Sequence, residues 1–216
     1  AIQVYRNTTS LGSITFSIGA MRSLTIAASG SAPYEVASGD LDGDGRPDIV
    51  SANESNPGSI SVFRNLSVSG TLNFSLKTDV SFTSPTSYYA YSIDISDLDK
   101  DGKPDIVVST SNSNASVFIL QNRSTIGFIS VVLVQTFSAG LINPYGLAIG
   151  DFDNDDRPDI VVANNTNPGY LAFFRNTNSI VGTISFTTTA ITASTGNGSY
   201  LGVGLGDFDG DGKVDV

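Results

Sequence analysis

Short runs of alternating apolar and polar residues recur along the chain, separated by turn-rich polar stretches. Residues 91–95 and 145–149 alternate with a period of two, which is typical of a β-strand with one apolar face. Each complete polar stretch is followed by an Ile-Val pair, at residues 49–50, 106–107 and 160–161, and such β-branched pairs are typical of buried strands. Helical periodicity is missing between these runs, so the pattern predicts an all-β chain.

Two further segments of each repeat also have the pattern of strands. Residues 60–65 and 171–176 predict a third strand, and residues 72–74 and 184–186 predict a fourth. About four repeats of about 55 residues, each with four antiparallel strands, are typical of β-propeller blades. Because a blade cannot bury both of its faces alone, the apolar rows predict a core between successive blades rather than a ligand pocket.

Acidic residues are concentrated in four nine-residue segments with the pattern D-x-D-x-D-x-x-x-D. These segments, residues 40–48, 97–105, 151–159 and 207–215, hold 17 of the 21 acidic residues and begin 57, 54 and 56 residues apart. Carboxylates at alternate positions repel one another, so each loop needs a bound cation to be stable. The spacing therefore predicts four metal loops, each joining the first two strands of a blade.

The side-chain ligands available in these loops are oxygen atoms, since the chain has no His and no Cys. Oxygen ligands favour a hard cation over zinc or copper, and calcium tolerates their irregular geometry better than magnesium does. We predict that calcium is bound by the Asp side chains at positions 1, 3, 5 and 9 of each loop and by the main-chain oxygen at position 7. These residues are Asp40, Asp42, Asp44, Arg46, Asp48, Asp97, Asp99, Asp101, Lys103, Asp105, Asp151, Asp153, Asp155, Arg157, Asp159, Asp207, Asp209, Asp211, Lys213 and Asp215.

The third loop departs from the others at position 6, where Asp156 replaces a glycine. We expect Asp156 to adopt a left-handed backbone at a modest energetic cost. Four bound dications would change the formal net charge from −10 to about −2, which is an ordinary value for a soluble domain.

The four loops and their spacing resemble the FG-GAP/VCBS-type repeats, the family whose calcium-binding blades form the integrin α-subunit propeller. Tyr145-Gly146 only approximates the Phe-Gly of that family, and residues 51–53 and 162–164 stand where Gly-Ala-Pro would be. These departures favour the bacterial-type or lectin-like branch over a true integrin. The resemblance implies a propeller, usually seven-bladed, in which calcium braces loops on one face and other loops bind ligands.

The repeats divide the chain at the start of each predicted first strand. The segment 1–33 is expected to be the second half of a blade with its connection, because residues 1–7 align with a third strand. Three repeats at 34–90, 91–144 and 145–200 follow, and 201–216 begins another. Both ends fall inside a repeat, which favours a segment of a larger propeller. The alternatives are closure into four blades or head-to-tail closure onto the next molecule to form a fibre.

The chain contains about twice as many Asn-x-Ser/Thr sequons as its composition predicts. Several recur at equivalent places in the repeats, although strands rich in Ser and Thr would also produce them. Glycosylation, together with loops suited to millimolar calcium, favours an extracellular or cell-surface location. The candidate glycosylation sites are Asn7, Asn53, Asn65, Asn73, Asn114, Asn122, Asn164 and Asn197.

Composition narrows the possible functions. The absence of His removes the commonest general base, and an acid-pair hydrolase would have only Glu35, Glu54, Asp79 and Asp94 available outside the loops. We therefore expect a protein that is not an enzyme, although it could be the scaffold of a secreted one. The acidic balance disfavours nucleic acid as a partner, and no apolar stretch is long enough for direct membrane insertion.

Two functions fit these expectations. The leading hypothesis is a calcium-stabilised recognition or adhesion module whose partner is a protein or glycan ligand. The alternative is a structural subunit of a glycosylated extracellular filament, whose partners would be further copies of itself.

Overall fold

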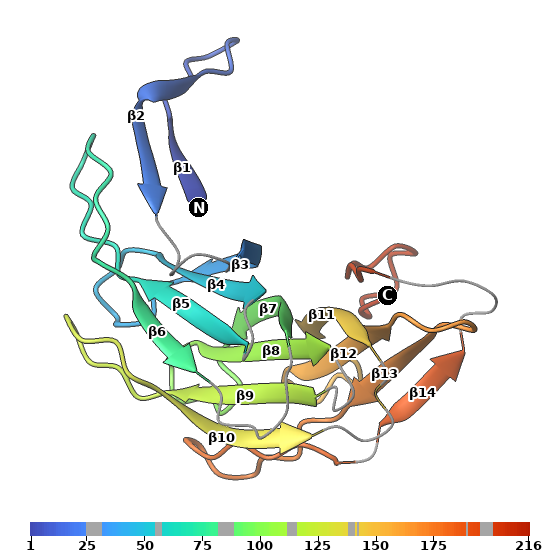
Figure 1. Cartoon of the computed structure of the whole chain (residues 1–216). Helices are drawn as coiled ribbons and strands as arrows, with labels where there is room; N and C mark the ends of the chain where they lie inside the picture. The colour runs from blue at the N-terminus through green and yellow to red at the C-terminus, as the bar shows by residue number, and fades with distance from the viewer. Residues whose placement is uncertain are drawn as a thin grey trace.

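The computed structural model describes residues 1–24, 32–54, 58–81, 89–111, 116–137, 141, 143–188, 190–194 and 201–216. The described residues form strands, turns and irregular segments, and contain no helix. The strands (Figure 1) are β1 (Ile2–Asn7), β2 (Phe16–Leu24), β3 (Ala32–Gly39), β4 (Asp48–Glu54), β5 (Ser59–Phe63), β6 (Thr78–Ser81), β7 (Tyr89–Ser96), β8 (Asp105–Ser111), β9 (Ser116–Asn122), β10 (Val131–Phe137), β11 (Pro144–Gly150), β12 (Asp159–Asn164), β13 (Tyr170–Phe174) and β14 (Ile191–Ser194).

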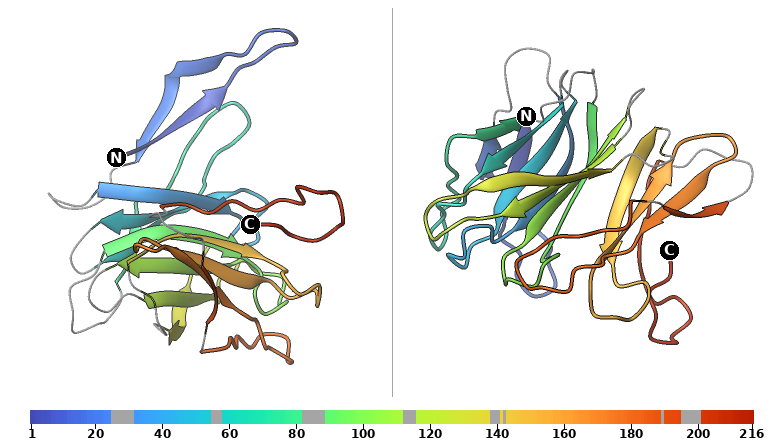
Figure 2. Two further views of the ribbon diagram at one scale, coloured as in Figure 1. Left: turned by 90° about the vertical axis from the view of Figure 1, so that its right-hand side faces the viewer. Right: turned by 90° about the horizontal axis from the view of Figure 1, so that it is seen from below.

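These strands form three antiparallel sheets of four strands and one hairpin. The sheet orders are β3-β4-β5-β6, β7-β8-β9-β10 and β11-β12-β13-β14, so every strand pairs with its neighbour in sequence. Strands β1 and β2 form the hairpin, which projects from one end of the molecule (Figures 1 and 2). The first strands β3, β7 and β11 lie side by side. This arrangement confirms the all-β, propeller-blade prediction.

Successive sheets pack face to face and bury their apolar side chains between them. Strand β8 begins with a continuous apolar run because both of its faces are buried. Ile106 and Val108 lie in the core shared with the first sheet, whereas Val107 lies in the core shared with the third. All three side chains are inaccessible to solvent. The apolar rows are therefore a core between blades, as predicted from the sequence.

The predicted fourth strand is misplaced in two repeats. Residues 72–74 and 184–186 form the return of a hairpin, with single bridges at Asn65↔Phe74 and Asn176↔Phe186. The longer fourth strands, β6 and β14, begin several residues later. The apolar alternation misled the prediction because Phe74 and Phe186 pack on core clusters from within the hairpin.

The first strand of each sheet has the same irregularity, which is invisible in the sequence pattern. The register shifts between Pro33 and Glu35 in β3, and at the equivalent places in β7 and β11. The three tyrosines at these shifts gather together, with ring centroids of Tyr91 and Tyr145 4.4 Å apart and those of Tyr34 and Tyr91 4.6 Å apart. The first strands β3, β7 and β11 are therefore in contact through the aromatic rings at these shifts.

Candidate metal centres

Each acidic segment is the bend of a tight hairpin between the first two strands of a repeat. The first three segments connect β3 to β4, β7 to β8 and β11 to β12. The residue before each segment pairs with its last aspartate, as in Gly39↔Asp48 and Ser96↔Asp105. The fourth segment closes in the same way through a Gly206↔Asp215 bridge. The predicted position of the loops is thus found in all four copies.

The four loops also share one backbone conformation. Positions 4 and 6 are left-handed in every copy, with φ of 73° and 84° at Gly43 and Gly45. In the third loop Asp156 has a φ of 63°, which confirms the conformation predicted from its place in the pattern. Position 4 was not foreseen, because Lys100 and Asn154 adopt this conformation without being glycines.

The aspartate at position 1 organises the loop around its carboxylate. In the first loop, Asp40 Oδ1 accepts a hydrogen bond from the Asp44 amide at 3.0 Å and Oδ2 accepts one from the Gly45 amide at 2.7 Å. The second and third loops repeat both bonds, and the fourth repeats the bond from position 6. These bonds fold each loop inward and bring the other carboxylates near position 1.

In the first three loops, the aspartate at position 9 is buried and holds the loop to the sheet. Asp105 Oδ2 accepts a hydrogen bond from the Leu98 amide at 3.0 Å, and Oδ1 accepts one from the Asn122 amide at 2.8 Å. Asp48 and Asp159 make the same pairs of bonds. Burial raises the pKa of the Asp48 and Asp159 carboxyls. It raises the pKa of Asp105 to about 7. A nearby dication would favour the charged form of each.

In each loop, three carboxylates offer oxygen atoms that lie within 4.8 Å of one another and could hold a metal ion. In three loops the group is formed by positions 1, 3 and 9, and in the second loop by positions 1, 3 and 5. An all-oxygen donor set of this kind fits a hard cation. The predicted main-chain oxygens of Arg46, Lys103, Arg157 and Lys213 remain predictions. The groups are Asp40, Asp42 and Asp48; Asp97, Asp99 and Asp101; Asp151, Asp153 and Asp159; and Asp207, Asp209 and Asp215.

Cationic side chains contact the carboxylates at position 5 in three loops. Asp44 pairs with Arg46 and Arg64, Asp155 pairs with Arg157 and Arg175, and Asp211 pairs with Lys213. Although burial acts to raise the pKa of Asp42, the hydrogen bonds from Arg64 and the Gly127 amide outweigh it and lower that pKa. The roles of Arg64 and Arg175 were missed in the sequence, although both lie 24 residues after the first aspartate of a loop.

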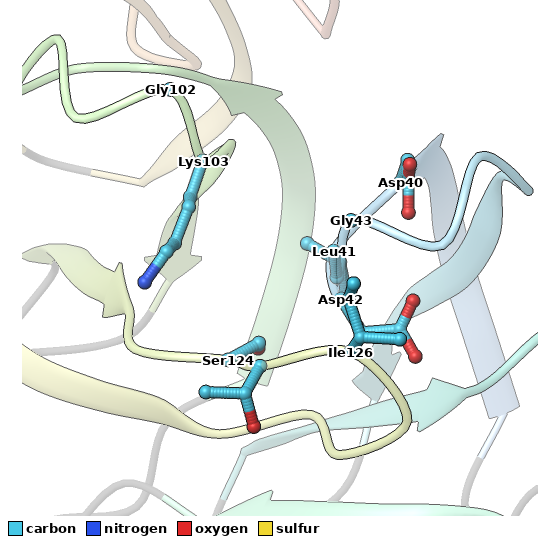
Figure 3. Close-up of a pocket in the computed structure, with 9 residues that line it drawn as sticks. Asp40, Leu41, Asp42, Gly43, Gly102, Lys103, Ser124 and Ile126 are labelled. Atoms are coloured by element: carbon cyan, nitrogen blue, oxygen red, sulfur yellow. The ribbon is translucent and has the colours of Figure 1, made fainter.

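A pocket of about 580 Å³ lies between the first two loops (Figure 3). Asp40 and Asp42 of the first loop line one side, and Lys103 of the second loop lies on the other side. Ser124 and Ile126 line its remaining wall. These two residues come from the hairpin that follows β9. The second repeat therefore reaches the metal loop of the first.

This contact recurs between the second and third repeats. We call the hairpins at residues 66–73, 123–130 and 177–185 the outer hairpins. The Gly127 amide donates to Asp42 Oδ2 at 2.9 Å, and the Gly182 amide donates to the Asp99 main-chain oxygen at 3.0 Å. In both cases the outer hairpin of one repeat binds position 3 of the preceding loop. Each such loop is thus part of a contact between repeats.

Asparagines at the end of the third strands form a second link between repeats. Asn122 Nδ2 donates to the Pro104 oxygen of its own loop at 3.0 Å and to the Leu41 oxygen of the preceding loop at 2.9 Å. Asn176 makes the equivalent bonds to Pro158 and Leu98. The sequence showed that these residues recur in register, but not that they join neighbouring loops.

The sequons occupy very different environments. The side chains of Asn53, Asn65, Asn122 and Asn164 are buried, and the amide nitrogens of the first three donate hydrogen bonds within the fold. A glycan on any of these four would have no room in the folded chain, so the expectation that they carry sugar is wrong for the folded state. Asn7 and Asn73 are exposed. Asn114 and Asn197 lie outside the described residues.

Of the four carboxylates outside the loops, Glu35 and Asp94 line one pocket between the first strands, whereas Glu54 and Asp79 do not line it. Glu35 accepts a hydrogen bond from the Ile93 amide, and Asp94 accepts one from the Ile149 amide, so both link the first strands of adjacent sheets. Asp79 pairs with Lys77 and accepts a hydrogen bond from Ser61, whereas Glu54 is exposed at the end of β4. The contacts of Glu35, Asp94 and Asp79 are structural.

The sheets and loops together define a repeat protein built of propeller-like blades, each with an acidic bend between its first two strands. The sequence model of the FG-GAP-like repeat matches three overlapping stretches, residues 40–108, 97–162 and 151–216. The chain belongs to the FG-GAP-like repeat family, which confirms the resemblance. Repeats of this family are structural and recognition modules.

No curated protein matches the chain. Among the described residues, no helix has the length and apolar character needed to cross a bilayer.

Proposed function

We propose that this chain is a calcium-stabilised β-propeller module that presents a rigid surface for recognition or adhesion outside the cell. The observation that carries the proposal is the fourfold recurrence of one loop, with the same left-handed positions and three carboxylates whose oxygens lie within 4.8 Å. Like charges held this closely stabilise a fold only when a cation neutralises them. The metal would thus be a structural component of the module.

Calcium suits these sites better than other common ions. The donors brought together are carboxylate oxygens, and neither His nor Cys exists in the chain. Calcium accepts such irregular oxygen sets, whereas magnesium demands an octahedron and keeps its waters. When bound, the ion would supply positive charge to the loop, and the chain's aspartates would orient and hold it.

The contacts between repeats explain why such an ion would matter to a binding surface. Outer hairpins and asparagines of one repeat bind the loop of the preceding repeat through Gly127 and Asn122. An ion that fixes a loop would therefore also fix the neighbouring blade. A larger ring of such blades would present its remaining loops as a rigid ligand-binding surface.

An extracellular location follows from the calcium requirement and is supported by the exposed sequons. Loops of this kind suit the millimolar calcium found outside cells. Of the sequons that the structure describes, we propose glycosylation only at Asn7 and Asn73, whose side chains are exposed. A glycan at either position would project into solvent and leave the packing between blades unchanged.

Thermal unfolding with and without divalent ions tests this function. We expect EDTA to lower the melting temperature markedly, because the emptied loops leave close carboxylates to repel one another. Calcium should restore the original value, and magnesium at the same concentration should restore it less. Equal melting temperatures in EDTA and calcium would contradict the proposal.

Size-exclusion chromatography and negative-stain microscopy in calcium separate recognition from the filament alternative. A monodisperse species is expected for a recognition module. Head-to-tail polymers would instead support a structural subunit of a filament.

A further inference from the structure

Arg64 and Arg175 occupy equivalent places in the first and third repeats, each 24 residues after the first aspartate of its loop. Arg64 Nη2 lies 2.8 Å from Asp44 Oδ2, and Arg175 Nη2 lies 2.8 Å from Asp155 Oδ2. In both repeats Nε of the same guanidinium donates to the aspartate at position 3. One guanidinium therefore bridges positions 3 and 5 of each loop.

The second repeat has Gln121 at the equivalent place. Gln121 Nε2 donates to Asp99 Oδ2 at 2.6 Å, which supplies a hydrogen bond without a positive charge. Arg123 contacts Gln121 Oε1 at 3.0 Å rather than a carboxylate of the loop. Within the part of the chain that the structure describes, no Lys or Arg forms an ion pair with the second loop.

The carboxylate at position 5 lies differently in the two kinds of loop. In the second loop, Asp101 is one of the three aspartates whose oxygens lie within 4.8 Å of one another. In the first and third loops the group contains position 9 instead, and Asp44 and Asp155 pair with arginines. Position 5 thus belongs to the close group in the second loop, where no Lys or Arg of the described chain pairs with it, and not in the three loops where it pairs with an Arg or Lys.

We propose that this residue sets the calcium affinity of its loop, so that Arg64 and Arg175 weaken the first and third sites and Gln121 leaves the second site tighter than either of them. The inference rests on the proposed calcium-binding function. A guanidinium beside the site repels the incoming cation and competes with it for the carboxylate at position 5. The same guanidinium offsets part of the loop's negative charge before calcium binds. As calcium rises, the second loop therefore fills before the first and third loops.

A calcium titration followed by amide NMR resolves the individual loops in the full chain. The amides at position 6 belong to Gly45, Gly102, Asp156 and Gly212, and each donates to the position 1 carboxylate of its own loop. Each amide resonance consequently reports the filling of one loop. In the wild-type chain the Gly102 resonance should reach its midpoint at a lower calcium concentration than those of Gly45 and Asp156.

Two reciprocal substitutions test the role of the charge. Arg64→Gln should lower the calcium midpoint at Gly45 by about tenfold, the order expected for removing one charge beside a partly buried dication. Gln121→Arg should raise the midpoint at Gly102 by a similar factor. The Gly212 midpoint should stay unchanged in both variants and serves as the internal control.

The outcomes distinguish this inference from the proposed function. If all four resonances titrate with calcium but Arg64→Gln leaves or raises the Gly45 midpoint, the inference is overturned and calcium binding stands. A Gly102 midpoint that stays the same or falls in Gln121→Arg overturns it as well. If no resonance responds to calcium, both the function and the inference fail. Should Arg64→Gln not fold without calcium, the Gln121→Arg result decides.

Discussion

The first and second acidic loops have the same nine-residue pattern and the same backbone, but their surroundings differ. Asp44 in the first loop contacts two arginines, whereas no Lys or Arg pairs with a carboxylate of the second loop in the described structure. The aspartates of the motif therefore determine the shape of the loop, whereas its cationic partners come both from a variable position of the motif and from outside it. A prediction about metal affinity needs both.

The largest expected effect concerns position 2, where the loops also differ in burial. Leu98 is fully buried between the second and third sheets, whereas its counterpart in the fourth loop, Phe208, is 75% exposed. We expect Leu98→Ala to lower the free energy of unfolding by about 3 kcal/mol, through lost burial and a cavity. Phe208→Ala should change it by less than about 0.5 kcal/mol. Denaturant unfolding in calcium measures both, and equal losses would show that the loops are equally packed.

The next effect concerns the links between repeats. Asn122→Ala removes the hydrogen bonds to the Leu41 and Pro104 oxygens and the one that its own side-chain oxygen accepts from the Ser124 amide. Leaving these buried groups unpaired should cost about 2–3 kcal/mol of stability. Asn73→Ala, at an exposed sequon, is the matched control and should cost little. If the two variants unfold at the same denaturant concentration, the proposed link between loops is wrong.

A smaller effect should appear in the pH dependence of the metal-free chain. The pKa of Asp105 is about 7 in the folded chain, because of burial, compared with an ordinary value of 3.8. Between these values the folded chain holds a proton that the unfolded chain has lost. The contribution of Asp105 to stability is therefore complete below about pH 4 and is lost as the pH rises to about 7.

Asp105→Asn tests this pH dependence in protein stripped of metal on a chelating resin. The variant should lose less stability than the wild type between pH 4 and pH 7 in denaturant unfolding. An unchanged slope would mean that the carboxyl of Asp105 titrates near its ordinary pKa.

The sequence predicted the parts of the structure that depend on local pattern. The loops, the strands flanking them and the left-handed backbone of Asp156 follow from residue types at fixed spacing. The core between blades follows from continuous apolar runs such as residues 106–108. These features depend on short-range sterics and on burial, and both leave a clear pattern in a single sequence.

Features that depend on neighbouring repeats were missed or misjudged. Asn65 and Asn122 matched a glycosylation sequon, but their amides bind loop oxygens, and Asn122 reaches one more than 80 residues away in the chain. Arg64 belonged to a strand pattern, and only the packed fold brings its guanidinium to Asp42 and Asp44. Such contacts join segments whose separation in sequence gives no local signal.

The number of calcium ions bound by each chain tests the central claim most directly. Native mass spectrometry of the full chain in calcium should show four ions, one for each acidic loop, and Asp99→Ala should reduce the number to three. A chain that binds no calcium, or that binds as many ions after the substitution as before it, would contradict the account.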